Sequence, residues 1–502
     1  MTIRLCLLGF VFLGLLPANA SAVGKKPNVL FLVTDDQRAD TIAALGNDVI
    51  KTPHLDKLVN QGYVFRNLYC MGSTVGAVCN PSRHMFLSGK ALYSYNPKIQ
   101  ENTFGAVMRA LGYITFHISK RGNTAKNYHK AFEFSGYLND GKDRRSGHHG
   151  RTAVDSAIKF LKTTWKKDRP LFMYIGFAGP HDPRVAAKKW LNLYDRNKIP
   201  LPKNYMPFHP FNNGDMKIRD ERLAPWPRTE EVVRKHLHDY YGCISSIDHN
   251  IGRLLTTLQQ LGELENTIIL FTSDHGLAIG SHGLFGKQSL YQHSMNSPCI
   301  IAGKGIPHGT SDALVYLFDL FPTAVDLVGG KIPQGLDGKS LAPIIRGQEK
   351  QVRDTVFLAY KNVQRAVRKG DWKLIRYPHV NVTQLFDLSQ DPNEMKNLAK
   401  SPQYANKVAE LMGVLKEQQK LFRDKAPLSV DNPEPAKVDE SFFKNAKKGK
   451  KRRSKKKKNS QVLYFDSAAF GSYPSFRSTS FRRLHHDSLF RIRPVLRCLS
   501  VG

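Results

Sequence analysis

Asn28-Val29-Leu30-Phe31-Leu32-Val33 begins the segment that decides the fold, and the pair Asp35-Asp36 follows it almost directly. A continuous apolar run of this kind is typical of a strand buried on both faces of a parallel sheet. The run ends abruptly at the two carboxylates. The segment therefore predicts a core strand that carries acidic side chains at its carboxyl end.

Three further strands with the same organisation are expected along the chain. Residues 113–118 lead into Ser119-Lys120, residues 171–177 into Gly179-Pro180-His181, and residues 267–272 into Asp274-His275. Helices are expected between them, from Pro53 after the capping residue Thr52, over 103–111, near 152–163, and over about 229–261. This alternation predicts an α/β fold with a doubly wound, mostly parallel sheet flanked by helices.

The polar residues at these strand ends point to one site. Ligands of open α/β sheets bind at the carboxyl ends of the strands. Asp35-Asp36, Lys120, His181 and Asp274-His275 each stand at such an end, so we expect the four clusters to converge.

Four regions are expected in the 502 residues: a signal peptide at 1–22, a catalytic domain at 23–335, a C-terminal subdomain at 336–425 and a disordered basic tail at 426–502. Short segments with turn signals such as Lys369-Gly370-Asp371 predict a smaller antiparallel-sheet α+β subdomain, with a helix over about 402–422 packed nearby. Residues 199–228, rich in proline and asparagine, predict a long surface excursion that forms a pocket wall.

The N-terminus has the features of a secretory signal. Arg4 supplies a positive start, residues 5–16 an apolar run, and residues 18–22 a small-residue cleavage site. The run is shorter than the roughly 20 apolar residues that a membrane-spanning helix needs. We therefore expect an exported protein, periplasmic, extracellular or lumenal, without a transmembrane anchor.

The net charge of +33 has two sources. Residues 441–502 hold 17 Lys and Arg against two Asp, and residues 444–458 hold eleven basic residues and no acid, which is typical of a solvated, disordered run. The rest of the chain is still basic and would attract an anionic substrate. Specific nucleic-acid binding is not expected of a chain that carries a signal peptide.

The six cysteines do not form a disulfide framework. Cys6 lies in the signal peptide and Cys498 in the tail. One disulfide bridge among Cys70, Cys79, Cys243 and Cys299 is possible. If Cys79 takes part in chemistry, an odd number of cysteines is left for pairing.

The strand-end carboxylates predict a metal site. Asp35, Asp36 and Asp274 would repel one another in one place unless a cation lies among them. Oxygen-rich ligation favours calcium or magnesium. Each aspartate alone is more often a helix cap or turn residue, but a doublet after one strand and an Asp-His pair after another favour metal binding.

Four basic or hydrogen-bonding residues accompany the carboxylates: Arg83, Lys120, His181 and Lys287. Together with a metal they could stabilise charge on a tetrahedral oxyanion. Lys287 alone would be a surface lysine, but it follows His275 closely in a glycine-rich loop, which favours a place in the site.

One further stretch, Cys79-Asn80-Pro81-Ser82-Arg83 continuing to Leu87-Ser88-Gly89, predicts a helix that starts near Cys79, because proline suits the first helical turn. This pattern, with the strand-end residues and the stretches 367–374 and 385–394, resembles the formylglycine-dependent sulfatases of the alkaline phosphatase superfamily. The resemblance covers roughly residues 27–422. Arylsulfatases often have asparagine at the position of His275. The histidine found here resembles the iduronate-2-sulfatase-like branch and its bacterial relatives.

The resemblance implies a set of roles. A formylglycine-generating enzyme would oxidise Cys79 to an aldehyde, which adds water to form a hydrate with two hydroxyl groups. One hydroxyl would attack the sulfur atom. Deprotonation of the other would then release sulfate and restore the aldehyde. Asp35, Asp36, Asp274, His275 and modified Cys79 would bind an ion, expected to be calcium, with magnesium as the alternative. Arg83 would hold the modified residue, and Lys120, His181 and Lys287 would contact the sulfate, one of them protonating the leaving alcohol.

The sequence departs from the family pattern in two places, and the first concerns the acid–base residues. The family has a histidine two or three positions after the first lysine, whereas Arg121-Gly122-Asn123 follows Lys120 here. Either Asn123 takes that place or His129 reaches in. Gln292 stands where Tyr-Glu is common, which is a milder change.

The expected function is therefore a sulfuric ester hydrolase that acts on a sulfated sugar. The first alternative is a phosphodiesterase or phosphonate monoester hydrolase of the same superfamily, because such relatives use the same modified cysteine on phosphorus. The second is a non-catalytic protein whose basic tail binds polyanions.

Overall fold

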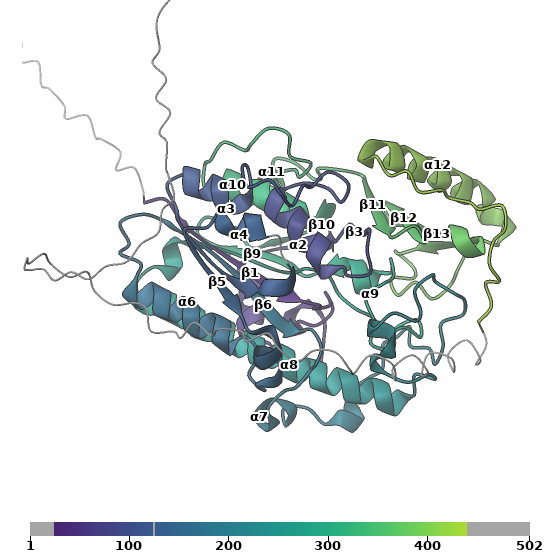
Figure 1. Ribbon diagram of the computed structural model, residues 1–502, viewed down its shortest axis with the longest axis horizontal. Helices are drawn as coiled ribbons and strands as arrows, with labels where there is room; N and C mark the ends of the chain where they lie inside the picture. Colours follow the sequence, from purple (N-terminus) through teal and green to yellow (C-terminus); the bar gives the residue numbers. More distant parts are fainter. Residues whose placement is uncertain (1–24, 124–125, 439–502) are drawn as a thin grey trace, which may run out of the picture. The chain divides into compact units, whose positions relative to one another are not determined.

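The computed structural model describes residues 25–123 and 126–438, all within one compact unit (Figure 1). Nine of the described strands form the main sheet, in the order β10-β2-β9-β7-β1-β6-β4-β5, with β8 paired to β2. Their bounds are β1 Asn28–Asp35, β2 Tyr63–Tyr69, β4 Ile114–Lys120, β5 Phe134–Leu138, β6 Leu171–Pro180, β7 Thr267–Ser273, β8 Asn296–Ser297, β9 Cys299–Gly303 and β10 Gly309–Tyr316. Strands β5, β4, β6, β1 and β7 run parallel, whereas β9 is antiparallel to β7 and β2. The predicted doubly wound, mostly parallel sheet is confirmed.

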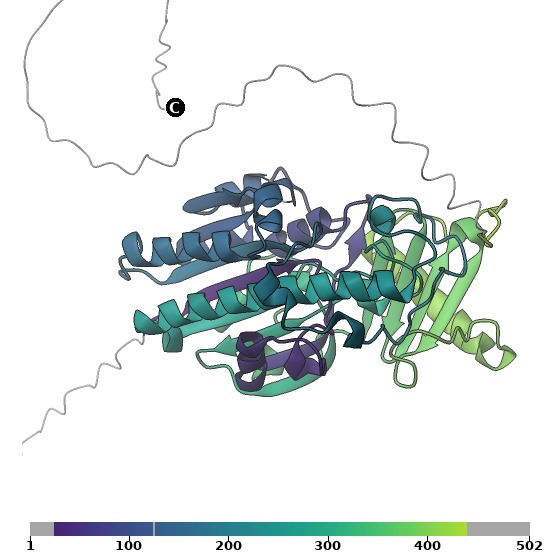
Figure 2. The same cartoon turned by 90° about the horizontal axis from the view of Figure 1, so that it is seen from below.

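Helices cover both faces of this sheet (Figures 1 and 2). On one face lie α2 (Cys79–Ser88), α3 (Phe104–Ala110) and α10 (Leu320–Leu327), and on the other α1 (Pro53–Gln61), α6 (Arg151–Thr163) and α8 (Glu230–Gln260). A hydrophobic core lies on each face of the sheet, and strand β1 contributes to both cores because alternate side chains point to opposite faces. Phe31 contacts Phe86 and Phe104, while Leu30 and Leu32 belong to the core under α6 and α8. The shorter helices are α4 Lys126–Lys130, α5 Asp140–Arg145, α7 Lys188–Leu191, α9 Gln292–Met295 and α11 Ala342–Ile345.

A second sheet has the order β14-β13-β12-β11-β3. Strands β11 (Thr355–Tyr360), β12 (Gln364–Lys369), β13 (Trp372–Tyr377) and β14 (Val382–Asp387) are antiparallel, and α12 (Ala405–Phe422) packs nearby, as predicted. The fifth strand, β3 (Gly72–Ser73), was not expected and pairs parallel with β11. Gly72 has φ 108°, and a Cβ there would lie 1.9 Å from the Ala359 carbonyl oxygen, so the close approach requires glycine. This sheet therefore holds the chain just before Cys79.

The N-terminus of α1 corrects one prediction. Thr52 occupies the N-cap position, but its hydroxyl accepts no hydrogen bond from the helix; it accepts from the amide of Ala43 instead. The capping oxygen comes from Asp248 of α8, whose carboxylate accepts from the amides of His54 and Leu55 at 3.1 and 2.7 Å. Thr52 is the expected cap of α1 because it directly precedes the helix. The cap is instead Asp248, which the packing of α1 against α8 brings to the helix N-terminus.

The end of the described chain packs against the rest. Residues 426–438 belong to the region predicted as a tail, and they hydrogen-bond elsewhere: the amide of Asn212 donates to the carbonyl of Ala436 at 2.8 Å, and the amide of Glu434 to the carbonyl of His379 at 2.7 Å. The basic run 444–458 and the predicted signal peptide at 1–22 lie outside the described residues. The domain boundary at residue 335 stays a prediction.

Two further sequence expectations concern cysteines and membrane spans. Cys70, Cys79, Cys243 and Cys299 are all buried free thiols, so the bridge left open by the sequence is not formed. In residues 25–123 and 126–438, no helix combines the length and apolar character needed to cross a bilayer.

Two buried histidines make stability depend on pH. His209 donates from Nδ1 to the carbonyl of His282 at 2.8 Å, and the His282 ring stacks on Tyr291 at 4.0 Å. Burial lowers the pKa of His209 to about 4 and that of His282 to about 3. Both values lie below the unfolded value of about 6.5, so this contribution to stability is complete above pH 6.5 and is lost as the pH falls towards 4.

We predict that replacing His209 by Asn reduces the acid sensitivity of the fold. Each such histidine adds about 1.4 kcal/mol per pH unit to the slope of unfolding free energy between pH 6.5 and 4. The slope, measured by urea unfolding at several pH values, should fall by about this amount in His209→Asn. His308→Asn, at an exposed position, is the control. Equal slopes for wild type and His209→Asn would contradict the prediction.

Candidate active site

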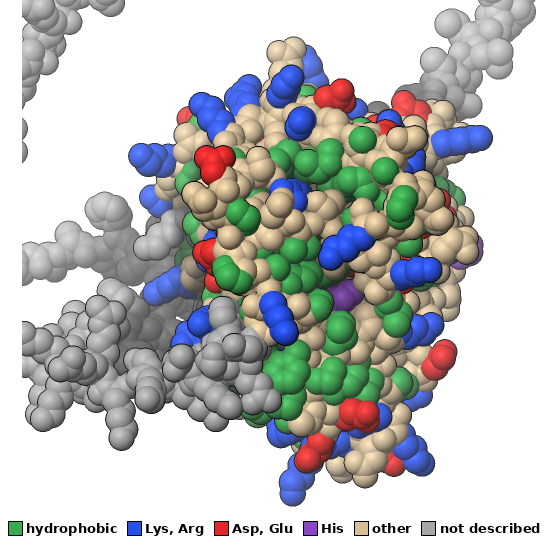
Figure 3. All heavy atoms as spheres, turned by 90° about the vertical axis from the view of Figure 1, so that its right-hand side faces the viewer, with side chains coloured by type: hydrophobic (Ala, Val, Ile, Leu, Met, Phe, Trp, Pro, Cys, Tyr) green, Lys and Arg blue, Asp and Glu red, His purple; other side chains and the backbone are tan. Residues whose placement is uncertain are grey.

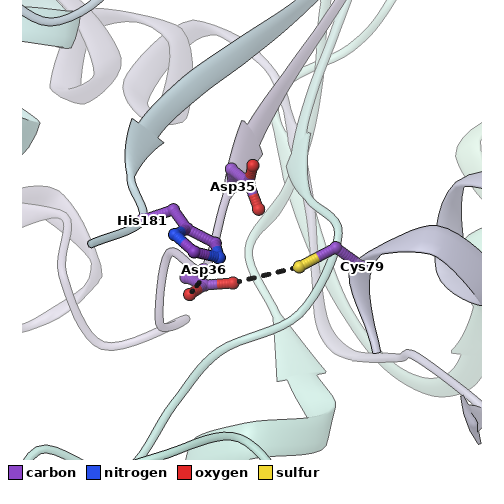
Figure 4. Close-up of side chains that lie close together, drawn as sticks. All are labelled: Asp35, Asp36, Cys79 and His181. Atoms are coloured by element: carbon purple, nitrogen blue, oxygen red, sulfur yellow. Dashed lines mark hydrogen bonds and ion pairs between the residues drawn. The ribbon is translucent and has the colours of Figure 1, made fainter. Parts of the chain in front are cut away.

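The strand-end residues meet at one edge of the main sheet. Asp35 ends β1 and Asp36 follows it, Lys120 ends β4, His181 follows β6, and Asp274 follows β7. Figure 4 shows the side chains of Asp35, Asp36 and His181 directed towards Cys79. The parallel order β7-β1-β6-β4 places these ends side by side, so the convergence expected from the sequence is present.

Cys79 is the first residue of α2, as its neighbour Pro81 suggested. Its Sγ lies 3.1 Å from Lys287 Nζ, 3.2 Å from His275 Nε2 and 3.4 Å from Asp36 Oδ1. Burial, followed by the nearby Asp35 carboxylate, raises the pKa of the Cys79 thiol well above its ordinary value. An unmodified thiol here is protonated at neutral pH and is a weak nucleophile.

The turn at Asp36 is held in an unusual conformation. Asp36 has φ 70°, in the left-handed region that non-glycine residues rarely adopt. Its amide donates to Asp274 Oδ1 at 3.0 Å, and its carbonyl accepts from the hydroxyl of Tyr240 at 2.6 Å. These contacts from β7 and α8 fix the direction of the Asp36 carboxylate.

Each carboxylate has a buried cation beside it. Lys120 Nζ lies 2.6 Å from Asp35 Oδ2, Lys287 Nζ 2.8 Å from Asp36 Oδ1, and Arg83 Nε 3.0 Å from Asp274 Oδ2. Burial alone would raise the pKa of Asp35, but Lys120 and then Arg83 hold it well below its usual range. Burial and then the charge of Asp35 raise the pKa of Asp274.

The same residues fit a divalent cation. One ligand atom each from Asp36, Cys79, Asp274 and His275 lie within 4.8 Å of one another, and a second such set joins Asp35 and His181 to Asp36 and Cys79. Asp35 Oδ1 is buried and has no hydrogen-bond partner within the part of the chain that the structure describes. A buried carboxylate oxygen without a donor is costly, and hard cations bind such oxygens.

The rim of the site contains residues that the sequence did not single out. Arg144 Nη1 lies 3.1 Å from His181 Nδ1, and Arg219 binds both oxygens of Asp182 at 2.6 and 2.9 Å. Asp220 accepts from the Gln288 side chain at 2.8 Å. Arg219 and Asp220 belong to residues 199–228, so the predicted pocket wall does reach the site. Among these rim residues, Asp182 alone carries a sequence signal for a place in the site, because it is adjacent to His181.

Glu221 of the same excursion positions the Lys287 loop. Its carboxylate accepts from the amides of Phe285 and Gly286, at 2.9 and 2.7 Å, and pairs with Arg228 at 2.7 Å. A Cβ at Gly286 would lie 2.4 Å from Gln288 Oε1, so the loop is tightly packed. Glu221, which is distant in sequence, thus fixes the position of the Lys287 loop.

His129 and Asn123 are the two candidates for the position after Lys120 that the family fills with histidine. His129 Nδ1 lies 3.0 Å from the Tyr137 hydroxyl, and its ring stacks on His117 at 3.7 Å. Among the contacts of the described residues, none joins His129 to Lys120 or Cys79. The side chain of Asn123 lies outside the described residues, so its role stays a prediction.

Comparison with known proteins gives the family. A sulfatase family model matches residues 27–330, which include every strand-end residue of the site. The chain belongs to the sulfatase family. A second model, the C-terminal region of N-sulphoglucosamine sulphohydrolase, matches residues 280–421. The predicted membership is confirmed, whereas the iduronate-2-sulfatase-like branch stays a prediction.

The similar proteins include several sulfatases. An N-acetylglucosamine-6-O-sulfatase from Bacteroides thetaiotaomicron is 28% identical, with 80% of this chain and 88% of that protein covered. An arylsulfatase from Clostridium perfringens is 26% identical, with 78% and 94% covered. A solved structure described as a complex with its substrate D-glucosamine-2-N,6-O-disulfate has a TM-score of 0.66 at 25% identity, covering 80% of this chain and 99% of that one. A phosphonate monoester hydrolase of Agrobacterium radiobacter, at 21% identity and a TM-score of 0.65 with 81% and 100% covered, shares the fold.

We predict that Gly176 of β6 is essential for the position of Arg83 in this sulfatase. A Cβ at Gly176 would lie 2.8 Å from Arg83 Nη1 and 2.7 Å from the Ser119 Cβ. Gly176→Ala should therefore lower the free energy of unfolding by about 1–3 kcal/mol through overpacking. It should also lower sulfate-ester hydrolysis at least roughly tenfold, because Arg83 holds Asp274.

Gly136→Ala on β5 is the matched control, since its Cβ would meet nothing closer than 3.8 Å. Chemical denaturation and steady-state assays compare the two variants. Indistinguishable stability and activity of both variants would contradict the assigned packing.

Proposed function

We propose that this sulfatase hydrolyses the sulfate ester of a sulfated sugar, with formylglycine made from Cys79 as nucleophile and calcium as the bound ion. The observation that supports this most strongly is the surroundings of Cys79. Its Sγ stands within 3.4 Å of a lysine, a histidine and an aspartate, at the first residue of a helix. Formylglycine would supply an aldehyde hydrate, one hydroxyl of which attacks sulfur while the other later releases sulfate.

The chain's own residues divide the remaining work. Lys120, Lys287 and His181 surround the place where the sulfate oxygens would lie, and their positive or hydrogen-bonding groups would stabilise charge that develops on them. Arg83, fully buried against Asp274 and 3.3 Å from the Tyr174 hydroxyl, would orient the modified residue. One of His181, Lys120 and Lys287 would donate the proton to the leaving alcohol.

Calcium fits the donor set. Asp35, Asp36, Asp274 and modified Cys79 would offer oxygens, the ligands that calcium prefers, and His275 would complete the site. A bound dication would lower the charge repulsion among three buried carboxylates and polarise the nucleophile. Magnesium is the alternative ion.

A sulfated sugar is proposed because relatives act on such compounds. The names of an N-acetylglucosamine-6-O-sulfatase and of a structure with a disulfated glucosamine substrate support the assignment. Export and a separate formylglycine-generating enzyme complete the proposal, on the basis of the sequence of residues 1–22 and 79–83.

The polyanion-binding alternative has less support. On the face shown in Figure 3, Lys and Arg side chains are scattered among acidic and apolar ones, so this face of the described residues has no concentrated basic patch. Tight binding of a polyanion needs several cations together. The basic run that suggested this function lies outside the described residues.

We predict that calcium stabilises the protein through this site. A ligand at 100 times its dissociation constant adds about 2.7 kcal/mol to the folded state, so the thermal midpoint should rise after chelated protein is reloaded with calcium. Asp274→Asn should abolish the rise, whereas the exposed Asp312→Asn should retain it. A thermal midpoint that does not change when calcium is added, or an equal rise in Asp274→Asn, would exclude the metal assignment.

We predict a preference for sulfur over phosphorus. The protein, produced together with a formylglycine-generating enzyme, should hydrolyse 4-nitrophenyl sulfate with a higher kcat/KM than 4-nitrophenyl phenylphosphonate. Cys79→Ala should be inactive towards both esters. Much faster phosphonate turnover would reject the sulfatase assignment in favour of the phosphonate monoester hydrolase.

A further inference from the structure

Arg184 is a buried arginine with two donor atoms that find no acceptor among the described residues. It follows His181 by three residues on the chain that leaves β6, and the residue is only 9% exposed. Both Nε and Nη2 are buried and have no hydrogen-bond partner in residues 25–123 and 126–438, and Cζ lies 5.6 Å from the centre of the Tyr240 ring. A buried cation with two unused donors is costly, so an acceptor from outside the protein would be bound strongly.

The carboxylates of the described residues form no ion pair with Arg184, although its charge helps, after Arg219 and His181, to lower the pKa of Asp182. Asp182 lies two residues before Arg184, but both of its carboxylate oxygens are bound by Arg219. From α8, the groups that face Arg184 are Tyr240, His236 and Cys243, and none of them is a carboxylate. Among the described residues, no carboxylate oxygen lies within 4.0 Å of the Arg184 guanidinium.

Arg144 is a second arginine, and it contacts His181 directly. Its Nη1 lies 3.1 Å from His181 Nδ1, and its Nε is buried with no partner among the residues described. Arg144 of α5 contacts His181, and Arg184 follows His181 by three residues, so two separate parts of the chain bring donors without a partner among the described residues to this end of β6. Guanidinium groups bind sulfate and carboxylate oxygens through paired hydrogen bonds.

We propose that Arg184 and Arg144 bind a second anionic group of the substrate, a sulfate or carboxylate next to the sulfate ester that is cleaved. This inference rests on the proposed function and narrows it to sugars that carry at least two negative groups. The catalytic lysines would hold the first sulfate, and the two arginines would orient the sugar through the second.

The competing explanation is structural. Arg184 could serve only to support Tyr240, whose hydroxyl accepts from the Arg38 amide and donates to the Asp36 carbonyl. Loss of that support would disturb the Asp36 turn and would slow hydrolysis of every sulfate ester alike. A binding role predicts instead a loss that depends on the second anion.

The kinetic test compares substrates that differ in the number of anionic groups. D-glucosamine-2-N,6-O-disulfate and a 6-O-sulfated disaccharide with a uronate carry a second anion, whereas N-acetylglucosamine-6-O-sulfate and 4-nitrophenyl sulfate do not. Arg184→Ala should lower kcat/KM for at least one two-anion substrate by a factor about 10–100 greater than for the one-anion substrates, mainly through KM. Arg184→Lys should recover part of the loss, and Arg144→Ala should show the same selectivity. The exposed Arg222→Ala is the control and should affect both classes equally.

A binding measurement separates this inference from the proposed function. Calorimetric titration of D-glucosamine-2-N,6-O-disulfate and of the uronate disaccharide into Cys79→Ala protein does not depend on turnover. Arg184→Ala in that background should weaken binding of at least one of them roughly tenfold or more, with unchanged thermal midpoint. Equal losses for both substrate classes, or unaltered binding of both probes, would overturn the inference. Absence of sulfate-ester hydrolysis by the modified wild type, with binding still dependent on Arg184, would instead overturn the proposed function.

Discussion

The repulsion among Asp35, Asp36 and Asp274 is the constraint on which the rest of the structure depends. All three are buried at the ends of the adjacent strands β1 and β7, where carboxylates are destabilising unless cations surround them. The fold brings Arg83, Lys120 and Lys287 from three separate parts of the chain to within 3.0 Å of them. A divalent ion would complete this balance, and the nucleophile would stand at its centre.

The surrounding architecture serves to hold this arrangement. Strand β3 attaches the chain before Cys79 to the second sheet, and Tyr240 of α8 holds the left-handed turn at Asp36. Glu221 fixes the loop of Lys287 through two backbone amides. The second sheet and the excursion at 199–228 are thus supports of the site as well as surfaces for substrate. Such supporting contacts are what keep a charged site in one geometry.

The fold and the centre of the site could be predicted from sequence because their signals are local. An apolar run such as residues 28–33 followed by Asp35-Asp36 predicts both a core strand and a group at its end, and strand order then brings the groups together. The rim could not be predicted in this way. Arg219 meets Asp182, and Glu221 meets Gly286, only because a long irregular segment folds back over the strand ends. Asp248 caps α1 for the same reason, since helix packing decides which carboxylate reaches an amide.

The central claim is that Cys79 acts as formylglycine, and the mass of one tryptic peptide tests it most directly. The peptide of residues 67–83 contains Cys79 and also Cys70, a buried thiol outside the charged cluster that serves as an internal control. In protein from its native host, we expect fragment ions with an aldehyde at position 79 and an intact cysteine at position 70. An unmodified thiol at both positions would contradict the account.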